Sequence, residues 1–221
     1  IEKVKEEDDI GPGNLLCNGY AQSKYVAEKL VMAAGERGLP VAIYRPSNIM
    51  GPEKTGICSA DSFVLKMIQG CLHMGKVPEI QALLNIVPVD YASQAIVQLS
   101  QQEESYSQAV NIVNPQAISW NHLLDMLGEM GYPLQRLSYE AWYTDLIKID
   151  NRGTVNTLVP LASIFSNYKF IQKSLGSFDF VGERIHRRLA DCGLSCPQVN
   201  AQLLQTYLAH LDDPTILSSR K

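Results

Sequence analysis

The sequence has 221 residues, of which 46% are hydrophobic and 19% are charged, and its net charge is −4. This is the composition of an ordinary soluble globular protein, with a length that suits one large domain or two small ones. The mildly acidic balance gives no reason to expect nucleic acid or an anionic membrane as a partner, and no apolar run approaches the roughly 20 residues that span a bilayer.

The N-terminal stretch IEKVKEEDDI is charged and lacks the apolar core of a signal peptide. Because the first residue is Ile rather than Met, we expect the chain to be a piece of a longer protein. The cysteines are odd in number and form no CxxC motif, so reduced thiols and a cytoplasmic location are the default expectation. The histidines fall in different predicted helices with no metal-ligand spacing, and no metal site is predicted. These residues are Cys17, Cys58, Cys71, Cys192 and Cys196, and His73, His122, His186 and His210.

The chain opens with a predicted loop and a predicted helix. Residues 1–17 are charged and contain Gly and Pro, which indicates a loop. Apolar residues then recur at helical spacing from about Tyr20 to Ala34, and Gly38 and Pro40 provide the stop signals.

A predicted strand and a second helix follow. The run VAIYR, 41–45, is typical of a buried strand and stops at Pro46, after which PSNIMGPEKTG reads as a loop. Asp61 or Ser62 is placed to cap a helix that carries Phe63, Val64 and Met67.

The alternation of strand and helix continues to about residue 131. LLNIVPV, 83–89, and AVNIVN, 109–114, read as further strands, each followed by a helix, with Asp90 and Ser119 as the expected caps. Apolar strands that alternate with helices indicate an α/β sheet.

Beyond residue 132 the sequence reads as mostly helical, with at most a short strand near YKF, 168–170. We therefore predict two regions: the C-terminal half of a parallel sheet over 1–131, and a helical subdomain over 132–221.

The Gly-rich turn that grips a dinucleotide's pyrophosphate is not recognisable in the sequence. Such a turn follows a strand and opens a helix. Gly11 and Gly13 follow a charged run instead, and Gly19 comes too late to complete the pattern. If the protein uses a nucleotide, we expect the phosphate-binding half to lie upstream of Ile1.

Tyr20 and Lys24 stand four positions apart in the stretch NGYAQSKYVAEKLV, 18–31, and so share one helix face. By itself this spacing is ordinary on exposed helices. Whether the pair is a reaction centre or only the exposed edge of a helix has to be judged from the other motifs of the chain.

The ordered motifs GYAQSKYVAEKLV, GLPVAIYRPSNIMGP, IVPVDYASQAIVQLS and VNIVNP together resemble the extended short-chain dehydrogenase/reductase superfamily. More narrowly, they resemble the terminal thioester reductase domains of nonribosomal peptide and polyketide synthetases, a domain shared with carboxylic acid reductases and aminoadipate reductase. The resemblance runs over nearly the whole chain but covers only the C-terminal portion of the family's domain. It implies a Rossmann-like sheet followed by a mostly helical substrate-binding subdomain.

The resemblance implies roles for Tyr20 and Lys24. In the superfamily the tyrosine donates a proton to the substrate carbonyl, and the lysine hydrogen-bonds the nicotinamide ribose. A phenol has an unperturbed pKa of about 10, which a neighbouring ammonium lowers. The alternative, Tyr25 with Lys29, points to a different face, and we expect Glu28 and Lys29 on the solvent-facing turn, so Tyr20 is preferred.

A second expected cluster, Pro46, Ser47, Asn48 and Ile49, follows the strand VAIYR, where ligands of open α/β sheets bind. In the superfamily the corresponding loop contacts the nicotinamide carboxamide; the alternative is that Pro46 only ends a strand. The family's third catalytic residue, a serine or threonine, has no counterpart in residues 1–17. We therefore expect this chain alone to be inactive.

The implied reaction is NADPH-dependent release of a carrier-bound acyl or peptidyl thioester as an aldehyde, or an alcohol after a second hydride transfer. NADH is the other possible donor. The implied partners are an acyl or peptidyl carrier protein with its phosphopantetheine arm and the upstream part of the polypeptide. The basic run RIHRR, 184–188, is interpreted as a solvated face rather than a carrier-docking patch.

Two alternatives stay open. One is another extended reductase or epimerase that acts on a free sugar or small carbonyl compound. The other is a non-catalytic fragment that binds substrate or docks a carrier, and NADPH titration of the chain separates that reading from an intact cofactor site.

Overall fold

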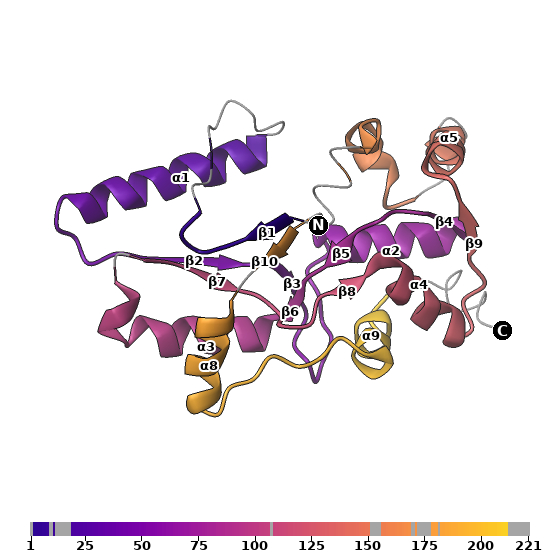
Figure 1. The fold of residues 1–221 in the computed structure, drawn as a ribbon. Coiled ribbons are helices and arrows are strands. Elements are labelled where there is room, and N and C mark those ends of the chain that lie inside the picture. Colours follow the sequence, from indigo (N-terminus) through magenta and orange to yellow (C-terminus); the bar gives the residue numbers. More distant parts are fainter. Residues whose placement is uncertain are drawn as a thin grey trace.

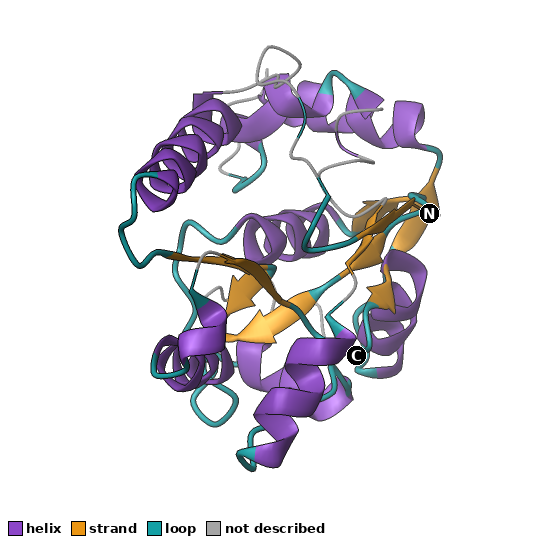
Figure 2. Cartoon of the chain, turned by 60° about the vertical axis from the view of Figure 1, so that its left-hand side comes forward, coloured by secondary structure: helices purple, strands orange, loops and turns teal. Residues whose placement is uncertain are grey.

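The computed structural model describes residues 2–8, 11, 19–106, 108–150, 156–168, 171, 178–180 and 182–211. It is an α/β fold in which short strands run through the middle and helices cover both sides (Figures 1 and 2). The strand pairs are mostly parallel, so the predicted fold class is confirmed. Within the described residues, no helix has both the length and the apolar character that a bilayer crossing requires.

Two parallel strand pairs, each a separate two-stranded sheet, form the centre of the fold. β2 (Ala42–Pro46) pairs with β7 (Gln108–Ile112), and β3 (Asn48–Met50) pairs with β6 (Ile86–Pro88). Ser47 extends the first ladder by donating its N–H to Ile112 O at 3.0 Å, and Asn48 opens the second by donating its N–H to Asn85 O at 3.2 Å. The chain therefore changes strand partner between two consecutive residues.

The segment after Pro46 was predicted as a loop, and this prediction is wrong over residues 48–50. Asn48, Ile49 and Met50 form β3 because β6 offers them a parallel edge, a partner that is distant in the sequence. The predicted strand 83–89 is likewise divided into β5 (Leu83–Leu84) and β6, because the two pieces on either side of Asn85 pair with different strands.

Three further pairs lie outside these two. β5 pairs antiparallel with β8 (Ile118–Ser119), and β4 (Lys76–Pro78) pairs parallel with β9 (Gln135–Leu137). β1 (Glu2–Val4) pairs parallel with β10 (Phe178–Phe180). The expected loop over 1–17 thus contains a strand, and the described strands beyond residue 132 are β9 and β10, whereas residues 169 and 170 of the expected YKF strand lie outside the described part.

The predicted N-caps are right at two helices and wrong at a third. Ser62 caps α2 (Phe63–Met74) and Ser119 caps α4 (Trp120–Glu129), each hydroxyl accepting a backbone N–H of the first turn. At α3 (Val89–Ser100) the cap position is Pro88, and Asp90 is already helical. Asp90 instead accepts the N–H of Glu53 at 3.1 Å, which fastens the loop after β3 to this helix.

Among the described residues, the further α-helices are α1, which matches the helix expected from about Tyr20, and a set in the C-terminal part. The described residues of that part are mostly helical, as expected. These helices are α1 (Gly19–Glu36), α5 (Tyr139–Asp150), α6 (Ala162–Phe165), α8 (Glu183–Asp191) and α9 (Ala201–Leu208).

Two hydrophobic cores support the fold. The larger gathers α2, α4, α5 and α9 around Trp120 and Trp142, which are 1% and 0% exposed. The smaller packs α3 and α8 against the central strands, with Val110 and Ile185 fully buried. Elements from both sides of residue 131 share each core, and the predicted boundary there stays a prediction.

Gly56 is a position where only glycine fits. Its φ is +67°, and a Cβ there would lie 2.2 Å from the carbonyl oxygen of Thr206 in α9. Gly75, at the C-terminus of α2, has a similar φ of +62° but nothing within 4 Å of the Cβ position. A side chain at either position would strain the backbone, but only one at Gly56 would also collide with a neighbouring segment.

We predict that Gly56→Ala lowers the unfolding free energy by about 1–3 kcal/mol more than Gly75→Ala does, because only the first forces α9 away from the loop. Both substitutions carry the left-handed strain of about 1–3 kcal/mol. Denaturant unfolding of the complete polypeptide checks this, and equal losses for the two variants would contradict the close approach at Thr206.

Candidate functional site

Helix α1 runs back over strand β2 in the opposite direction, so its N-terminal turn and the carboxyl end of β2 both lie toward the middle of the molecule (Figure 1). Glu28 and Arg45 fix the register, since they form an ion pair with Oε1 and Nη2 2.5 Å apart. From Glu28 the helix rises about 6 Å to Lys24 and about 12 Å to Tyr20. From Arg45 the strand advances about 7 Å to Ser47 and about 13 Å to Ile49. Tyr20 and Lys24 are thus about level with the second predicted cluster.

The two tyrosine–lysine pairs of α1 have the same local geometry. The Lys24 ammonium lies 5.6 Å from the Tyr20 ring centroid, and the Lys29 ammonium lies 5.6 Å from that of Tyr25. Tyr20 and Lys24 are exposed, with Tyr20 at 74%, whereas Tyr25 and Lys29 are half-buried. Geometry within α1 therefore does not choose between the pairs, and Tyr20 with Lys24 stays a prediction.

Glu28 does not lie on a solvent-facing turn, so that expectation is wrong. Its side chain is 16% exposed and that of Arg45 22%, because the carboxylate turns toward β2. Arg45 binds it through both Nε and Nη2 and also donates from Nη1 to the carbonyl of Glu6 at 3.2 Å. The interpretation of the sequence missed this pair, although the glutamate stands four residues after Lys24 in the stretch GYAQSKYVAEKLV.

In the second cluster, some side chains are held by hydrogen bonds within the protein and others are left for a ligand. Pro46 and Ile49 are exposed, with Ile49 at 42%. Asn48 has a structural partner, since its Nδ2 donates to the carbonyl of Asn85 at 2.9 Å. The Ser47 hydroxyl is buried and has no hydrogen-bond partner among the described residues. Ser47 is therefore the side chain of this cluster with unused hydrogen-bonding capacity.

Asn85 and Asn114 form a buried pair of amides beside this cluster, which the sequence patterns did not indicate. Asn114 N–H donates to Asn85 Oδ1 at 2.8 Å, and Asn85 Nδ2 donates to Asn114 O at 2.8 Å. Asn114 Nδ2 also donates to the carbonyls of Ile86 and Pro197, both at 3.0 Å. These bonds hold the end of β7, the start of β6 and the C-terminal segment together.

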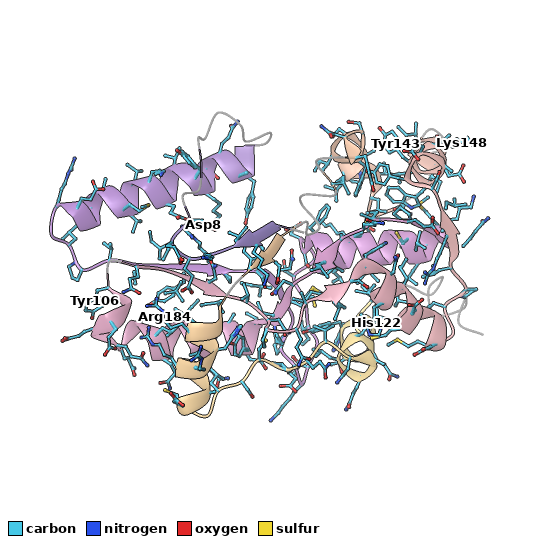
Figure 3. All side chains as sticks on the ribbon, viewed as in Figure 1. Asp8, Tyr106, His122, Tyr143, Lys148 and Arg184 are labelled. Atoms are coloured by element: carbon cyan, nitrogen blue, oxygen red, sulfur yellow. The ribbon has the colours of Figure 1, made fainter. Side chains whose placement is uncertain are left out.

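The basic run in α8 is occupied by ion pairs and hydrogen bonds. Arg184 donates to Gln108 Oε1 at 2.7 Å and pairs with Glu6 at 3.6 Å. Arg188 binds Gln102 and pairs with Glu104 at 3.9 Å. Figure 3 shows Arg184 on the side of β2 and β7 away from α1. Arg184 and Arg188 thus have partners within the chain, and the interpretation of this run as a solvated face rather than a carrier-docking patch stays a prediction.

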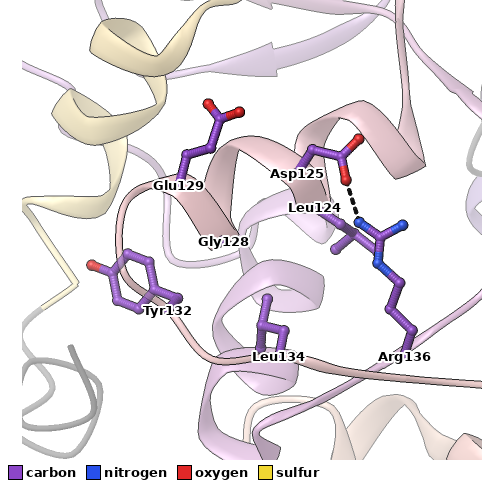
Figure 4. Close-up of a pocket in the computed structure, with 7 residues that line it drawn as sticks. All are labelled: Leu124, Asp125, Gly128, Glu129, Tyr132, Leu134 and Arg136. Atoms are coloured by element: carbon purple, nitrogen blue, oxygen red, sulfur yellow. Dashed lines mark hydrogen bonds and ion pairs between the residues drawn. The ribbon is translucent and has the colours of Figure 1, made fainter. Parts of the chain in front are cut away.

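A separate hollow of about 420 Å³ lies between α4 and β9, at the far end of the molecule from α1 (Figures 1 and 4). Arg136 Nη2 donates to Asp125 Oδ1 at 2.5 Å across it. Within the described residues, no group of three potential metal ligands gathers here or elsewhere. The hollow is lined by Leu124, Asp125, Gly128, Glu129, Tyr132, Leu134 and Arg136.

Comparison with known proteins identifies the class. Residues 2–96 match an NAD-binding family described as Male sterility protein. One of the proteins that make up the linear gramicidin synthase of Brevibacillus parabrevis is 32% identical over 208 residues, which are 93% of this chain and 4% of that protein. The large chain of L-2-aminoadipate reductase from Eremothecium gossypii is 38% identical over 142 residues, 63% of this chain and 10% of that protein.

A solved structure agrees over the whole chain. The terminal R domain from the myxalamid PKS-NRPS biosynthetic pathway has a TM-score of 0.88 and 33% identity, and the match covers 100% of this chain and 56% of that chain. Fold and matches together define an extended short-chain dehydrogenase/reductase. Within that class, the chain belongs to the family of terminal reductase domains of nonribosomal peptide and polyketide synthetases. It spans only about half of the R-domain chain and a small fraction of both curated relatives.

We predict that Asn114→Ala lowers the unfolding free energy by about 1–3 kcal/mol, because it leaves the buried carbonyl of Ile86 without its side-chain donor. Ser47→Ala is the matched control, since its hydroxyl makes no hydrogen bond within the described residues. Its stability is expected to stay within about 0.5 kcal/mol of the wild type. Denaturant unfolding of the complete polypeptide checks both, and a larger loss for Ser47→Ala would contradict the assignment of Ser47 as an unpartnered side chain.

Proposed function

We propose that this chain is part of an NAD(P)H-dependent thioester reductase that releases a carrier-bound acyl or peptidyl group as an aldehyde. The observation that carries the proposal is the register of α1 on β2. The Glu28–Arg45 pair brings Tyr20 and Lys24 about level with Ser47 and Ile49, at the carboxyl end of parallel strands, where α/β sheets bind their ligands. Membership of the reductase-domain family supplies the reaction class.

The nicotinamide end of the cofactor fits the residues present. The buried Ser47 hydroxyl, which has no partner in the part of the chain that the structure describes, lies at the carboxyl end of β2, where a carboxamide or ribose hydroxyl would satisfy it. The exposed Ile49 next to it offers apolar surface to a planar ring. Pro46, Ser47, Asn48 and Ile49 would hold that end, with Asn48 as a structural member because its side-chain Nδ2 and its backbone N–H both donate to the carbonyl of Asn85. Lys24 would bind the ribose.

Tyr20 and Lys24 are proposed to manage the proton. A bound nicotinamide supplies hydride to the thioester carbon. Tyr20 donates its phenolic proton to the carbonyl oxygen, and the adjacent Lys24 ammonium stabilises the phenolate that remains. The resulting hemithioacetal breaks its C–S bond, and its hydroxyl proton passes to sulfur, which gives an aldehyde and a free thiol.

The substrate is proposed to arrive on a carrier protein. The relatives are synthase components and reductases much longer than this chain, and the solved structure with high similarity is a terminal domain of such a pathway. The mostly helical part after residue 132 is proposed to shape the acyl pocket, because substrate chemistry varies among such enzymes on a common fold. The residue that selects NADPH and the third catalytic residue are expected from the upstream part of the polypeptide.

We predict that Tyr20→Phe lowers kcat by about 10²- to 10⁴-fold, because it removes the proton donor. The matched control is Tyr25→Phe, which removes a hydroxyl from the second tyrosine–lysine pair with the same 5.6 Å geometry. The complete polypeptide is assayed with an acyl group loaded on its carrier domain, by NADPH consumption and by mass spectrometry of the aldehyde.

Two results would count against the proposal. If Tyr25→Phe abolishes turnover and Tyr20→Phe does not, the catalytic pair is misassigned. If the wild type turns over free sugars but no carrier-bound thioester, the reductive-release function is wrong.

We further predict that Ser47→Ala weakens NADPH binding to the complete polypeptide by about three- to tenfold, the effect of about one lost hydrogen bond. Fluorescence titration measures this directly. An unchanged Kd, with the fold intact, would show that the Ser47 hydroxyl does not contact the cofactor.

A further inference from the structure

We propose that Glu28 and Arg45 form a positioning pair that sets the rotation and axial register of helix α1, and with it the placement of Tyr20 and Lys24 over the Pro46–Ile49 segment. This inference rests on the proposed function, since it concerns how the same site is assembled. Neither residue is proposed to touch the substrate.

The geometry of the pair is that of a rigid clamp. Arg45 donates to Glu28 Oε1 from Nη2 at 2.5 Å and from Nε at 3.2 Å, and Nε also lies 3.4 Å from Oε2. A guanidinium bound through two nitrogens restricts direction as well as distance, which a lysine ammonium does not. With side chains 22% and 16% exposed, the pair is shielded from much of the solvent screening that weakens surface ion pairs.

The clamp is anchored in both central strands. Arg45 is a residue of β2, and its Nη1 donates to the carbonyl of Glu6 at 3.2 Å. The Glu6 carboxylate, which is 13% exposed, accepts the backbone N–H of Asn111 in β7 at 2.9 Å. The glutamate of the helix is therefore bound to an arginine that is itself held by two strands.

Hydrophobic packing does not fix the rotation of α1 within the described structure, because none of its residues is buried. Val26 and Leu30, which are 54% and 66% exposed, lie about 160° around the helix from Glu28. The half-buried side of α1 carries Tyr25, Glu28 and Lys29, and Glu28 reaches β2 through its ion pair with Arg45. Tyr20 and Lys24 are exposed and lie about 80° and 40° around the helix from Glu28. The ion pair is therefore a directional contact that can set the rotation of α1.

The register follows from position in the sequence. Glu28 is one turn beyond Lys24, and Arg45 directly precedes the Pro46–Ile49 segment. A slip of α1 by one residue would move Tyr20 by about 1.5 Å along the strand and turn it by about 100°. A displacement of about 1 Å in a reaction centre can cost about 10²-fold in rate.

The test uses the complete polypeptide with its loaded carrier and compares Glu28→Gln, Glu28→Asp and a control, Asp125→Asn. Glu28→Gln removes the charge with little change in shape, and Glu28→Asp retains the charge. Asp125→Asn removes the carboxylate of another arginine pair of 2.5 Å, at the end of the molecule far from α1.

We expect kcat to fall by about 10- to 100-fold in Glu28→Gln and by less in Glu28→Asp, because placement of the reacting groups is impaired. The KM for the acyl carrier is expected to change by less than about threefold, and Asp125→Asn is expected to keep kcat within about twofold of the wild type. Hydrogen exchange provides a readout that needs no turnover: amides of residues 19–32 should exchange faster in Glu28→Gln and not in Asp125→Asn.

The outcomes separate the two proposals. Wild-type kcat in Glu28→Gln, or unchanged exchange over residues 19–32, overturns the positioning role even if the thioester is reduced. A wild type that reduces no carrier-bound thioester overturns the proposed function, and faster exchange confined to α1 in Glu28→Gln would then still support the clamp. A kcat loss of similar size in Asp125→Asn would show a general loss of folding and also overturn the positioning role.

Discussion

The change of strand partner between Ser47 and Asn48 is the constraint on which the rest of the structure depends. A strand that leaves one neighbour and joins another exposes backbone groups at the junction, and buried groups of this kind require partners. Here the carbonyl of Asn85 accepts the backbone N–H of Asn48. The Asn85 side chain in turn bonds the backbone N–H and carbonyl of Asn114, whose own amide donates to the carbonyl of Ile86. An unpaired polar atom in a buried network is costly, so the network favours the one arrangement in which every hydrogen bond is made.

This junction explains why the Pro46–Ile49 segment has a fixed backbone and also a hydroxyl group that a ligand could bind. Asn48 is engaged on Asn85 through its side chain and its backbone, which fixes the start of β3. Ser47, one residue earlier, has its backbone fixed on Ile112, while its hydroxyl has no partner among the described residues. A ligand group that hydrogen-bonds the Ser47 hydroxyl would meet a residue whose backbone is already fixed. The entropy lost on binding is then smaller.

The sequence predicted the elements with local signals and failed where the partner is distant. Ser62 and Ser119 were identified as caps because a capping hydroxyl and the N–H that it accepts lie within one turn. Asp90 carries the same signal, but Pro88 occupies the cap position and the carboxylate serves a loop residue 37 positions away. β3, β9 and β10 are strands of three residues that form only because a distant strand pairs with them. A stretch of three residues is too short to show the alternating pattern by which a strand is predicted from sequence.

The candidate site shows the same division. Tyr20, Lys24 and the Pro46–Ile49 segment were predicted from motifs and from their place at a strand end, and the register of α1 on β2 brings these segments about level. Glu28 was predicted to face solvent because a charged residue on a helix usually does. Its partner Arg45 lies 17 positions away on a strand, and no local pattern indicates that two such residues will meet. The amide pair was missed because its members lie 29 positions apart.

The close approach of Gly56 to Thr206 bears on how this domain can be recombined with its relatives. At Gly56 the loop that follows β3 lies directly against the backbone of the last described helix, with no room for a Cβ between them. A chimera that exchanges the C-terminal part alone would join a foreign α9 to a loop shaped for this one. A crossover that carries residues 51–58 together with α9 keeps the matched surfaces on the same parent, so these separate stretches of sequence form one unit of exchange.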